Sequence, residues 1–409
     1  MEKSFTRRLY RPLIEHHFKE YRQMVFLMGP RQVGKTTLCR TLPGVAESDT
    51  VYLNWDNLDH RELILKGPKK IAEAIDLNKA RKHPPFLMLD EIHKYSDWKT
   101  LLKGFFDTYS HYGEIKIVVT GSARLDVYKT GGDSLMGRYL RYRVHPFSCG
   151  ELITSSPFEG KIRPPSKLND DEFNALFTFG GFPEPLFKGE MDFYRGWSQL
   201  RLQQLFYEDV RDLTNVQEIK QMELLGAIIS QQTGSLCSYT SLSKKVRVSI
   251  ETIRRWLNTL RLMYYCFTIQ PWSKNITRSL LKDPKAYLWD WSLVPDKGAR
   301  AENFIASHLL KTCHYWTDKG EGDFGLYFLR DKEKREVDFL VTKNDIPWFL
   351  VEVKQSKQSL SPDLTYFFKM TGAKHAFQVV MDAPYEEVDC FSYDRPIVVS
   401  AKTFLSQLV

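Results

Sequence analysis

The chain has 409 residues, a net charge of +8, 43% hydrophobic residues and 26% charged residues. This composition is typical of a globular protein, and the length predicts two to four domains. No run of about 18 apolar residues is present and the first residues lack the apolar core of a signal peptide, so we expect neither a membrane span nor secretion. The six cysteines lie far apart without a CxxC pair, which favours a cytoplasmic location without disulfides or a cysteine zinc site.

From Met24 to Ser122, short apolar runs alternate with stretches of helical character. Apolar runs without alternation are typical of strands in a parallel sheet that is buried on both faces. The pattern therefore predicts an α/β layered domain. The expected strands are MVFLMG, VYLNW, PFLMLD and IKIVVTGS, and the expected helices are Thr37 to Leu42, a stretch that ends near Ala80, and Trp98 to Tyr109.

The segment GPRQVGKT, from Gly29 to Thr36, fits the P-loop pattern GxxxxGK[ST], directly after an expected strand and before a helix. Glycines let backbone N–H groups curl around phosphate, and the N-terminus of the helix adds favourable partial charge. We expect Lys35 to reach the β- and γ-phosphates and Thr36 to ligate Mg²⁺. The residues expected to bind ATP are Gly29, Pro30, Arg31, Gln32, Val33, Gly34, Lys35, Thr36 and Thr37.

Two carboxylates follow the apolar run FLML at the C-terminal end of an expected strand. Ligands of open α/β sheets bind at that end, so we expect Asp90 to hold Mg²⁺ and Glu91 to polarise the attacking water as a general base. The next strand ends in Thr120 and Ser122, polar groups that can position the γ-phosphate or the water, and Ser122 joins the catalytic set. Three motifs at strand ends in this order predict binding of ATP or GTP, and hydrolysis of the nucleotide with it; a chance match in a glycine turn is the alternative.

Five segments, GPRQVGKTT, YLNWD, LDEIHK, TGSA and GRYLRYRVHPFS, resemble the AAA+-like ATPases of bacteria and archaea that carry a DUF4143 C-terminal region. The resemblance spans nearly the whole chain and implies an ASCE-type P-loop fold. It also makes Arg138, in Gly137-Arg138-Tyr139, a candidate for neutralising transition-state charge as an arginine finger, in cis or in trans. The alternative is an exposed arginine in a basic run with Arg141 and Arg143.

The segment from Ser238 to Leu257 has the pattern of a helix-turn-helix. Leu242 and Val246 share one face of the first helix, and Ser249 is placed to cap the second helix. The second helix continues with Ile253, Trp256, Leu257 and Leu260 at core spacing. A β wing is expected to follow, over Tyr264 to Pro271 and Thr277 to Leu281.

Basic residues crowd this module, and Glu251 is the only acidic residue between Ser238 and Leu281. A winged helix of this charge can bind the phosphates of duplex DNA, whereas the alternative is a module that only packs against the ATPase. The basic residues are Lys244, Lys245, Arg247, Arg254, Arg255, Arg261, Lys274 and Arg278, of which Lys244, Lys245, Arg254 and Arg255 are the expected DNA contacts.

The runs REVDFLV and FLVEVK predict adjacent strands near the C-terminus. Alternate side chains of a strand share a face, so Glu352 and Lys354 lie together and Asp338 can lie across from them. Two carboxylates beside a lysine can hold divalent ions and activate water for phosphodiester hydrolysis. The arrangement resembles the PD-(D/E)XK nucleases, which implies catalytic roles for Asp338, Glu352 and Lys354. In that resemblance Glu302 matches an extra acidic residue, and Val337 departs from the proline that precedes the aspartate.

Mg²⁺ or Mn²⁺ is the ion expected at this C-terminal site, bound by Glu302, Asp338 and Glu352. Hard oxygen ligands without Cys or His favour these ions over zinc. Three converging carboxylates would also repel one another unless a cation lay between them. Two alternatives stay open: a fold of this kind that binds without cutting, and a surface hairpin whose charges face solvent.

The sequence thus predicts an α/β multidomain chain. Its predicted function is ATP binding and hydrolysis coupled to DNA binding or metal-dependent DNA processing, through a hinge-type switch. The alternative is an ATP-driven signalling or scaffold protein whose C-terminal domain binds a protein partner without cleavage; homo-oligomer formation stays open. The predicted domains are a P-loop ASCE/AAA+-like ATPase domain (1–155), a helical lid or linker (156–230), a winged-helix module (231–284) and a DUF4143 or PD-(D/E)XK nuclease-like domain (285–409).

Overall fold

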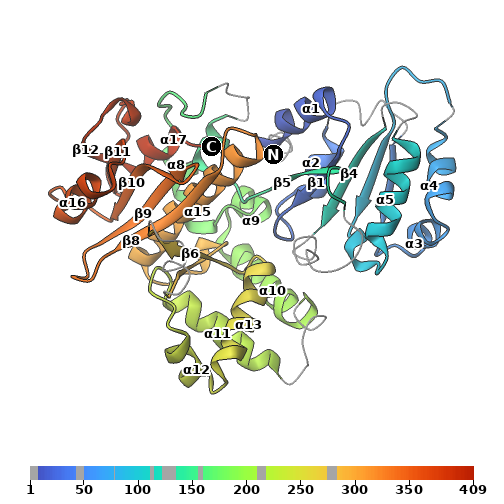
Figure 1. Cartoon of the computed structure of the whole chain (residues 1–409). Coiled ribbons are helices and arrows are strands. Elements are labelled where there is room, and N and C mark those ends of the chain that lie inside the picture. Colours follow the sequence, from blue (N-terminus) through green and yellow to red (C-terminus); the bar gives the residue numbers. More distant parts are fainter. Residues whose placement is uncertain are drawn as a thin grey trace. The chain divides into compact units, whose positions relative to one another are not determined.

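A computed structural model of the chain describes residues 8–42, 50–77, 79–110, 115–121, 135–154, 160–209, 218–273 and 283–409. The chain divides into two compact units, Met1–His145 and Pro146–Val409 (Figure 1). None of the helices in the described ranges is long and apolar enough to cross a membrane. The predicted α/β multidomain class is confirmed, and the finer division into four domains stays a prediction.

The first unit is built on five parallel strands in the order β2-β3-β4-β1-β5. β1 and β3 are buried along their whole length, as expected for strands with helices on both faces. The strands are β1 (Met24–Met28), β2 (Thr50–Asn54), β3 (Phe86–Asp90), β4 (Lys116–Gly121) and β5 (Tyr139–Arg143). The helices are α1 (Tyr10–Glu20), α2 (Lys35–Arg40), α3 (Leu58–Leu65), α4 (Pro68–Ile75) and α5 (Trp98–Tyr109), with a 3₁₀ turn, η1 (Ile92–Lys94), after β3.

Helices α3, α4 and α5 cover one face of this sheet (Figure 1). Alternate residues of the strands, among them Phe26, Leu87 and Val119, pack there against Ile71 of α4 and Phe105 of α5. This period of two follows from the pleat of a strand. Because the strands are all parallel, their C-terminal ends lie at one edge of the sheet, where the connecting loops carry the polar residues.

Each of the four predicted strands of this unit is present within one residue of its expected ends, and α2 begins at Lys35 rather than at Thr37. The stretch expected to be helical up to Ala80 forms two helices, because Gly67 adopts φ 87° and Pro68 begins α4. The sequence patterns do not predict α1 or β5. Charged residues alternate with apolar ones in β5, which lies at the edge of the sheet and is only partly buried.

The second unit contains a seven-stranded mixed sheet in the order β12-β11-β10-β9-β8-β6-β7. β8, β9 and β10 are antiparallel neighbours, and β11 and β12 continue the sheet in parallel with β10. The predicted strand runs REVDFLV and FLVEVK are confirmed as β9 and β10. The strands are β6 (Cys266–Pro271), β7 (Lys285–Leu288), β8 (Phe324–Arg330), β9 (Glu336–Lys343), β10 (Ile346–Lys354), β11 (His375–Val380) and β12 (Pro396–Ser400).

Helices make up the first part of the second unit and also flank its sheet. The segment predicted as a helical lid or linker is mostly helical from Asp170 onward, with a break between α8 and α9. The helical elements are α7 (Cys149–Ile153), α8 (Asp170–Phe179), α9 (Pro183–Lys188), α10 (Met191–Gln204), the π-helix η2 (Leu205–Asp209), α11 (Ile219–Gln231), α12 (Tyr239–Val246), α13 (Ile250–Leu262), η4 (Trp291–Leu293), α15 (Lys297–Asp318), α16 (Pro362–Thr371), η5 (Cys390–Ser392) and α17 (Ala401–Ser406).

The helix-turn-helix pattern is confirmed as the helix pair α12 and α13. The Ser249 hydroxyl accepts a hydrogen bond from the Thr252 N–H (3.0 Å), which is the predicted cap of α13. The predicted second wing strand, Thr277 to Leu281, lies outside the described residues. The strand that pairs with β6 is β7, antiparallel to it and further along the chain, so a domain boundary at 284/285 separates the two strands of one hairpin.

Candidate functional site

The P-loop connects β1 to α2 along a backbone that suits phosphate binding. Gly29 (φ 154°), Gln32 (φ 59°) and Gly34 (φ 93°) adopt positive φ angles, and such loops turn successive N–H groups toward a common point. A Cβ atom at Gly29 would lie 2.2 Å from the Val144 carbonyl oxygen, so only glycine fits there. Arg8, which the motifs do not predict, donates a hydrogen bond to the Val33 carbonyl (2.7 Å) and thereby fixes the loop.

Lys35 lies at the start of α2 and is buried within the P-loop. Its ammonium donates hydrogen bonds to the carbonyl oxygens of Gly29 (2.8 Å) and Pro30 (2.7 Å). Burial lowers the pKa of Lys35 to about 8, although the nearby carboxylates of Glu91 and Asp90 act in the opposite direction. The structure thus places this cation inside the loop, beside the two carboxylates predicted for the same site.

Asp90, at the end of β3, is the centre of a network of hydroxyl groups. Its carboxylate accepts hydrogen bonds from Thr36 (3.0 Å), Tyr52 (2.8 Å) and Thr120. Burial and the Asp90 hydrogen bond raise the pKa of Tyr52 to about 12, so this phenol stays a donor at neutral pH. The Thr36 hydroxyl and the Asp90 carboxylate are hard oxygen donors in direct contact, and this donor pair fits Mg²⁺.

Tyr52 belongs to the expected strand VYLNW, which lies beside β3. Tyr52 contacts Asp90 only because β2 lies next to β3 in the sheet. The P-loop motif does not predict this strand order. The sequence offers a weaker signal for Tyr52. This residue lies between Val51 and Leu53, near the C-terminal end of a parallel strand, and ligands bind at that end of the sheet.

Glu91 follows Asp90 in the left-handed conformation (φ 54°), which is uncommon for a residue with a side chain. Its Oε2 atom is buried and has no hydrogen-bond partner among the described residues. The same atom lies 3.6 Å from His93 Nε2 and 3.6 Å from Lys94 Nζ, and Asp56 holds Lys94 through an ion pair of 2.6 Å. The Glu91 carboxylate therefore keeps an oxygen that can accept a proton, next to Asp90 and Lys35.

Of the two other predicted catalytic residues of this unit, only Arg138 can be placed, and it does not lie at the P-loop. Ser122 lies outside the described residues. Arg138 precedes β5, whose first residue Tyr139 pairs with Met24, whereas the P-loop follows Met28 at the opposite end of the same sheet. Five strand residues separate these ends by roughly 16 Å.

Arg138 instead forms a two-pronged ion pair with Asp107 of α5, at 2.7 Å and 2.9 Å. A guanidinium held at that end of the sheet does not reach a nucleotide on the P-loop of its own chain, so a role in cis is excluded by the strand direction. The reading as an arginine finger in trans stays a prediction.

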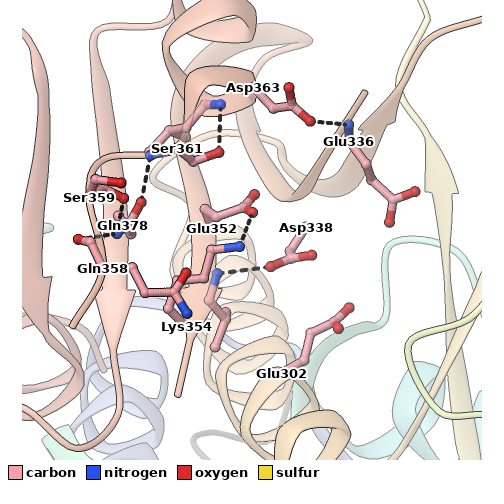
Figure 2. A network of polar contacts seen from close by, with 12 residues as sticks. Glu302, Glu336, Asp338, Glu352, Lys354, Gln358, Ser359, Ser361, Asp363 and Gln378 are labelled. Atoms are coloured by element: carbon pink, nitrogen blue, oxygen red, sulfur yellow. Dashed lines mark hydrogen bonds and ion pairs between the residues drawn. The ribbon is translucent and has the colours of Figure 1, made fainter. Parts of the chain in front are cut away.

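In the second unit, the predicted C-terminal carboxylates and Lys354 are grouped on β9, β10 and α15 (Figure 2). Lys354 donates a hydrogen bond to Glu352 (2.9 Å), and the Val353 N–H donates to Asp338 (2.8 Å). The two-residue turn Asn344-Asp345 (φ 50° and 63°) makes the hairpin between β9 and β10 tight, which brings Asp338 beside Glu352 as predicted.

Three residues that the sequence did not single out complete this cluster: Lys285 and Tyr287, both on β7, and Glu336 at the start of β9. Lys285 Nζ lies 2.6 Å from Glu336 Oε1, 3.2 Å from Glu302 Oε1 and 3.8 Å from Asp338 Oδ1. The Tyr287 hydroxyl donates a hydrogen bond to Glu302 (2.6 Å). No motif marks Lys285 or Tyr287, because β7 is far from the hairpin in sequence and reaches the cluster only through the sheet.

Burial changes the acidity of the clustered carboxyl groups. It raises the pKa of Glu302 to about 7 and that of Glu352 to about 7, and the Asp338 charge adds to both shifts. Burial also raises the pKa of Asp338. For Lys285, burial favours the neutral amine, but the carboxylates of Glu302, Asp338 and Glu336 outweigh it and raise its pKa, so its ammonium stays charged.

No group of three or more His, Cys, Asp or Glu side chains in the described part of the chain is arranged to hold a metal ion. The reason is visible at Glu302, which is engaged by Lys285 and Tyr287. Asp338 and Glu352 remain as the predicted pair, and Glu352 Oε2 is buried without a hydrogen-bond partner in the described residues. Carboxylate oxygens of this kind are the hard donors that Mg²⁺ prefers.

The four predicted DNA contacts lie on α12 and α13, and all four are exposed. Arg255 is paired with Glu218 (3.2 Å), and the guanidinium of Arg254 lies over the Tyr239 ring. Lys244 and Lys245 form no ion pair with any described residue. The two lysines in the last turn of α12 therefore add exposed charge to this helix pair, as do the exposed Arg247 and Arg261. Lys274 and Arg278 lie outside the described residues.

Comparison with known proteins identifies three regions. Residues 21–153 match the model of an AAA domain, residues 170–297 match a domain of unknown function (DUF8612), and residues 297–391 match another (DUF4143). An uncharacterised protein of Methanocaldococcus jannaschii is 24% identical over 330 residues, which are 77% of this chain and 71% of that protein. An uncharacterised protein of Haemophilus influenzae is 22% identical over 352 residues, 80% of this chain and 82% of that protein.

Among solved structures, the Orc1 protein of Aeropyrum pernix in complex with DNA is similar over 73% of this chain and 92% of that chain. Its sequence identity is 14% and the TM-score is 0.31. The domain matches confirm the two regions that the family resemblance implied, the AAA region at the N-terminus and the DUF4143 region near the C-terminus.

Proposed function

We propose that the AAA domain carried by residues 21–153 hydrolyses ATP and that its nucleotide state controls DNA binding by the second unit. The observation that supports the ATPase is the contact of Thr36 with Asp90. These residues lie 54 positions apart in the sequence, yet the sheet brings the hydroxyl and the carboxylate within 3.0 Å at the exit of the P-loop. A bound Mg²⁺ would supply charge neutralisation of the phosphates at this pair.

The chain's own residues then have separate tasks. The P-loop backbone orients the phosphates, and Lys35 neutralises charge on them. Asp90 is held by the hydroxyls of Thr36, Tyr52 and Thr120, which keep its carboxylate in position. Glu91 Oε2 takes the proton of the attacking water, because it is the carboxylate oxygen of the first unit that is buried and has no hydrogen bond to a described residue.

Two variants test this assignment. Lys35→Ala is expected to lose nucleotide affinity, because it removes the cation inside the P-loop. Glu91→Gln is expected to bind ATP as the wild type does and to lose about 10²- to 10⁴-fold in turnover, the usual contribution of a general base. Binding is measured by titration with a fluorescent ATP analogue and turnover by phosphate release. Glu62→Gln, an exposed change on α3, is the matched control. Turnover by Glu91→Gln equal to that of the wild type would refute the assignment of the base.

DNA binding is proposed for the helix pair α12 and α13 as part of a winged helix. The support is structural and electrostatic: two capped helices are followed by the β6–β7 hairpin, and Lys244 and Lys245 point exposed charge away from the buried face. Duplex phosphates are the complementary ligand for such a patch. The alternative, in which the module serves only for packing, requires no exposed lysines.

The variant Lys244→Ala/Lys245→Ala is expected to weaken DNA binding at low salt and to flatten the plot of log affinity against log salt by about 0.9 per lost phosphate contact. Adding Arg254→Ala and Arg255→Ala is expected to add less, because Arg255 already pairs with Glu218. Fluorescence anisotropy with duplex DNA at several salt concentrations measures both quantities. The control is Lys66→Ala/Lys69→Ala, which removes two exposed lysines from the first unit. Unchanged affinity and slope in the α12 variant would favour the packing-only alternative.

Metal-dependent cleavage at the C-terminal cluster is the second candidate function. The observation that favours it is the unpartnered, buried Glu352 Oε2 beside Asp338 and Lys354. A bound Mg²⁺ or Mn²⁺ would supply an activated water there. Lys354 would hold charge on the scissile phosphate, and Asp338 is fixed in place by the Val353 N–H.

The variant Asp338→Ala/Glu352→Ala is expected to lose Mn²⁺ binding and any cleavage while ATP hydrolysis persists, since the two sites belong to different compact units. Calorimetric titration with Mn²⁺ and incubation with DNA of several structures, with and without ATP, are the measurements. If the double variant binds Mn²⁺ as well as the wild type does, the carboxylates are structural. The chain is then better described as an ATPase whose C-terminal domain binds a partner without cutting.

A further inference from the structure

The carboxylate cluster of the second unit already contains a cation, the Lys285 side chain. Lys285 is 3% exposed, and its ammonium lies between 2.6 and 3.8 Å from oxygens of Glu336, Glu302 and Asp338. These three carboxylates come from two different elements, α15 and β9, and Lys285 comes from a third, β7. Carboxylates brought together in a buried site repel one another unless a cation lies between them. In this fold the Lys285 ammonium is that cation.

The contacts divide the four acidic side chains between two lysines. Lys285 holds Glu302, Glu336 and Asp338, and Lys354 holds Glu352. Arg330 also pairs with Glu336 at 2.5 Å. Every carboxylate of the cluster therefore has a positively charged partner within the second unit.

Glu302 is held by contacts on two sides. It accepts hydrogen bonds from both Lys285 (3.2 Å) and Tyr287 (2.6 Å). On its other side it packs against the backbone of Gly234, where an added Cβ atom would lie 2.9 Å from Glu302 Oε2. A divalent cation at this carboxylate would have to displace a tethered ammonium, and a tethered group competes at high effective concentration.

One carboxylate oxygen of the cluster, Glu352 Oε2, does not contact either lysine through a hydrogen bond. Glu352 Oε2 is buried and has no hydrogen-bond partner among the described residues, although Glu352 Oε1 is bonded to Lys354. A buried carboxylate oxygen without a partner costs free energy, and a cation is the ligand that would relieve the cost. The site thus combines an oxygen that can accept a cation with an internal ammonium that holds the neighbouring oxygens.

We propose that Lys285 is the resident counter-ion of the cluster and limits its affinity for divalent cations by competing for Asp338 and Glu302. This proposal rests on the metal site proposed above, and it assigns Lys285 a positioning role rather than a catalytic one. Removal of the ammonium leaves Asp338, Glu302 and Glu336 without their shared cation, so a divalent ion becomes the preferred replacement.

The test is a calorimetric titration of the full chain with Mn²⁺, without nucleotide, on the wild type and Lys285→Met. The variant is close in length and carries no charge. We expect it to bind Mn²⁺ at least about tenfold more tightly than the wild type, which corresponds to about 1.4 kcal/mol. Lys374→Met, an exposed lysine next to β11, is the matched control and should leave the affinity unchanged.

A third variant locates the site. Lys285→Met combined with Asp338→Asn and Glu352→Gln should lose the gained Mn²⁺ affinity, and any weak binding at Thr36 and Asp90 cancels in this comparison. Equal or weaker binding by Lys285→Met than by the wild type overturns the proposal, and so does a gain that survives in the triple variant. ATP hydrolysis, measured in parallel, shows separately whether the proposed ATPase function holds.

Thermal unfolding covers the case in which Lys285→Met folds poorly. Without metal its midpoint should fall below that of the wild type, because the carboxylates repel one another. Added Mn²⁺ should raise the midpoint of the variant more than that of the wild type. A variant that stays unfolded and is not rescued by Mn²⁺ contradicts the proposal, since the lysine would then serve as more than a replaceable cation.

Discussion

Buried carboxylates carry the proposed chemistry in both units, and they are stabilised in different ways. Asp90 accepts hydrogen bonds from three hydroxyl groups, which satisfy its oxygens without cancelling its charge. Glu302 and Glu352 depend on ammonium groups instead. The first arrangement leaves a negative charge for a ligand ion, whereas the second neutralises much of the charge internally.

This difference predicts a pH dependence of stability. The pKa of Glu302 and that of Glu352 are about 7 in the folded chain, above their ordinary value of 4.5. A carboxyl group whose pKa is raised by folding contributes stability that is complete below pH 4.5 and is lost as pH rises through 7. In chelator, these two carboxyl groups should therefore lower the free energy of unfolding between pH 5 and pH 8. Buried His308, whose pKa is lowered to about 3, acts in the opposite direction, so the carboxyl contribution has to be isolated with a variant.

Glu352→Gln removes one of these groups. The change in unfolding free energy from pH 5 to pH 8 should therefore be more positive in the variant than in the wild type, by an amount on the order of 2 kcal/mol. Urea unfolding at the two pH values, followed by tryptophan fluorescence, measures the difference. Glu387→Gln, an exposed change, serves as the control. An identical pH dependence in the Glu352 variant and the wild type would show that this carboxyl group is not destabilised by burial.

The position of helix α7 against α15 depends on contacts between residues far apart in the sequence, which sequence patterns do not predict. The short helix α7 is fixed to α15 by an ion pair of 2.5 Å between Glu151 and Lys311, which are 3% and 2% exposed. The His308 ring accepts a hydrogen bond from the Cys149 N–H at 3.0 Å, and Lys311 also donates to the Pro146 carbonyl. α15 is therefore the element against which the start of the second unit is built.

Breaking this pair should be costly. Lys311→Met leaves the Glu151 carboxylate buried without its cation, so we expect the second unit to lose about 3 to 5 kcal/mol of stability. Lys311→Met/Glu151→Leu removes both charges and should recover most of that loss. Urea unfolding of the two variants and the wild type measures the effect. A double variant no more stable than Lys311→Met would mean that the Pro146 and backbone contacts matter more than the charge pair.

At the scale of the whole molecule, the two compact units have separate cores and separate sites. Residues 1–145 contain the P-loop, Asp90 and Glu91, and residues 146–409 contain α12, α13 and the carboxylate cluster. Each unit is large enough to bury its own core, so each is expected to unfold cooperatively.

Calorimetric scanning with and without Mg²⁺ and an ATP analogue should therefore resolve a transition that nucleotide raises and a second transition that responds less. A ligand at a concentration of 100 times its Kd adds about 2.7 kcal/mol to the state that binds it. Lys35→Ala should abolish the ligand-induced rise and leave the other transition unchanged. A nucleotide-induced rise that survives in Lys35→Ala would place the binding site elsewhere.

The sequence by itself determined the elements and residues whose signals are local. Apolar runs predicted the buried strands. Glycine spacing predicted the P-loop, and the carboxylates at a strand end predicted Asp90 and Glu91 as site residues. The cap at Ser249 and the hairpin that brings Asp338 beside Glu352 are equally local, since a few neighbouring residues fix them. The sequence patterns did not predict the edge strand β5, because this strand is only partly buried and therefore lacks the apolar run that marks a buried strand.

Only the tertiary structure decided which groups meet across the sheets. The order β2-β3-β4-β1-β5 brings Tyr52 to Asp90, and the direction of β5 carries Arg138 to the end of the sheet away from the P-loop. In the second unit, pairing of β6 with β7 and β8 delivers Lys285 to the carboxylates of Glu302 and Asp338. Strand order depends on the summed packing of many side chains, so no single motif encodes it, and the internal cation of this cluster appears only once the sheet is assembled.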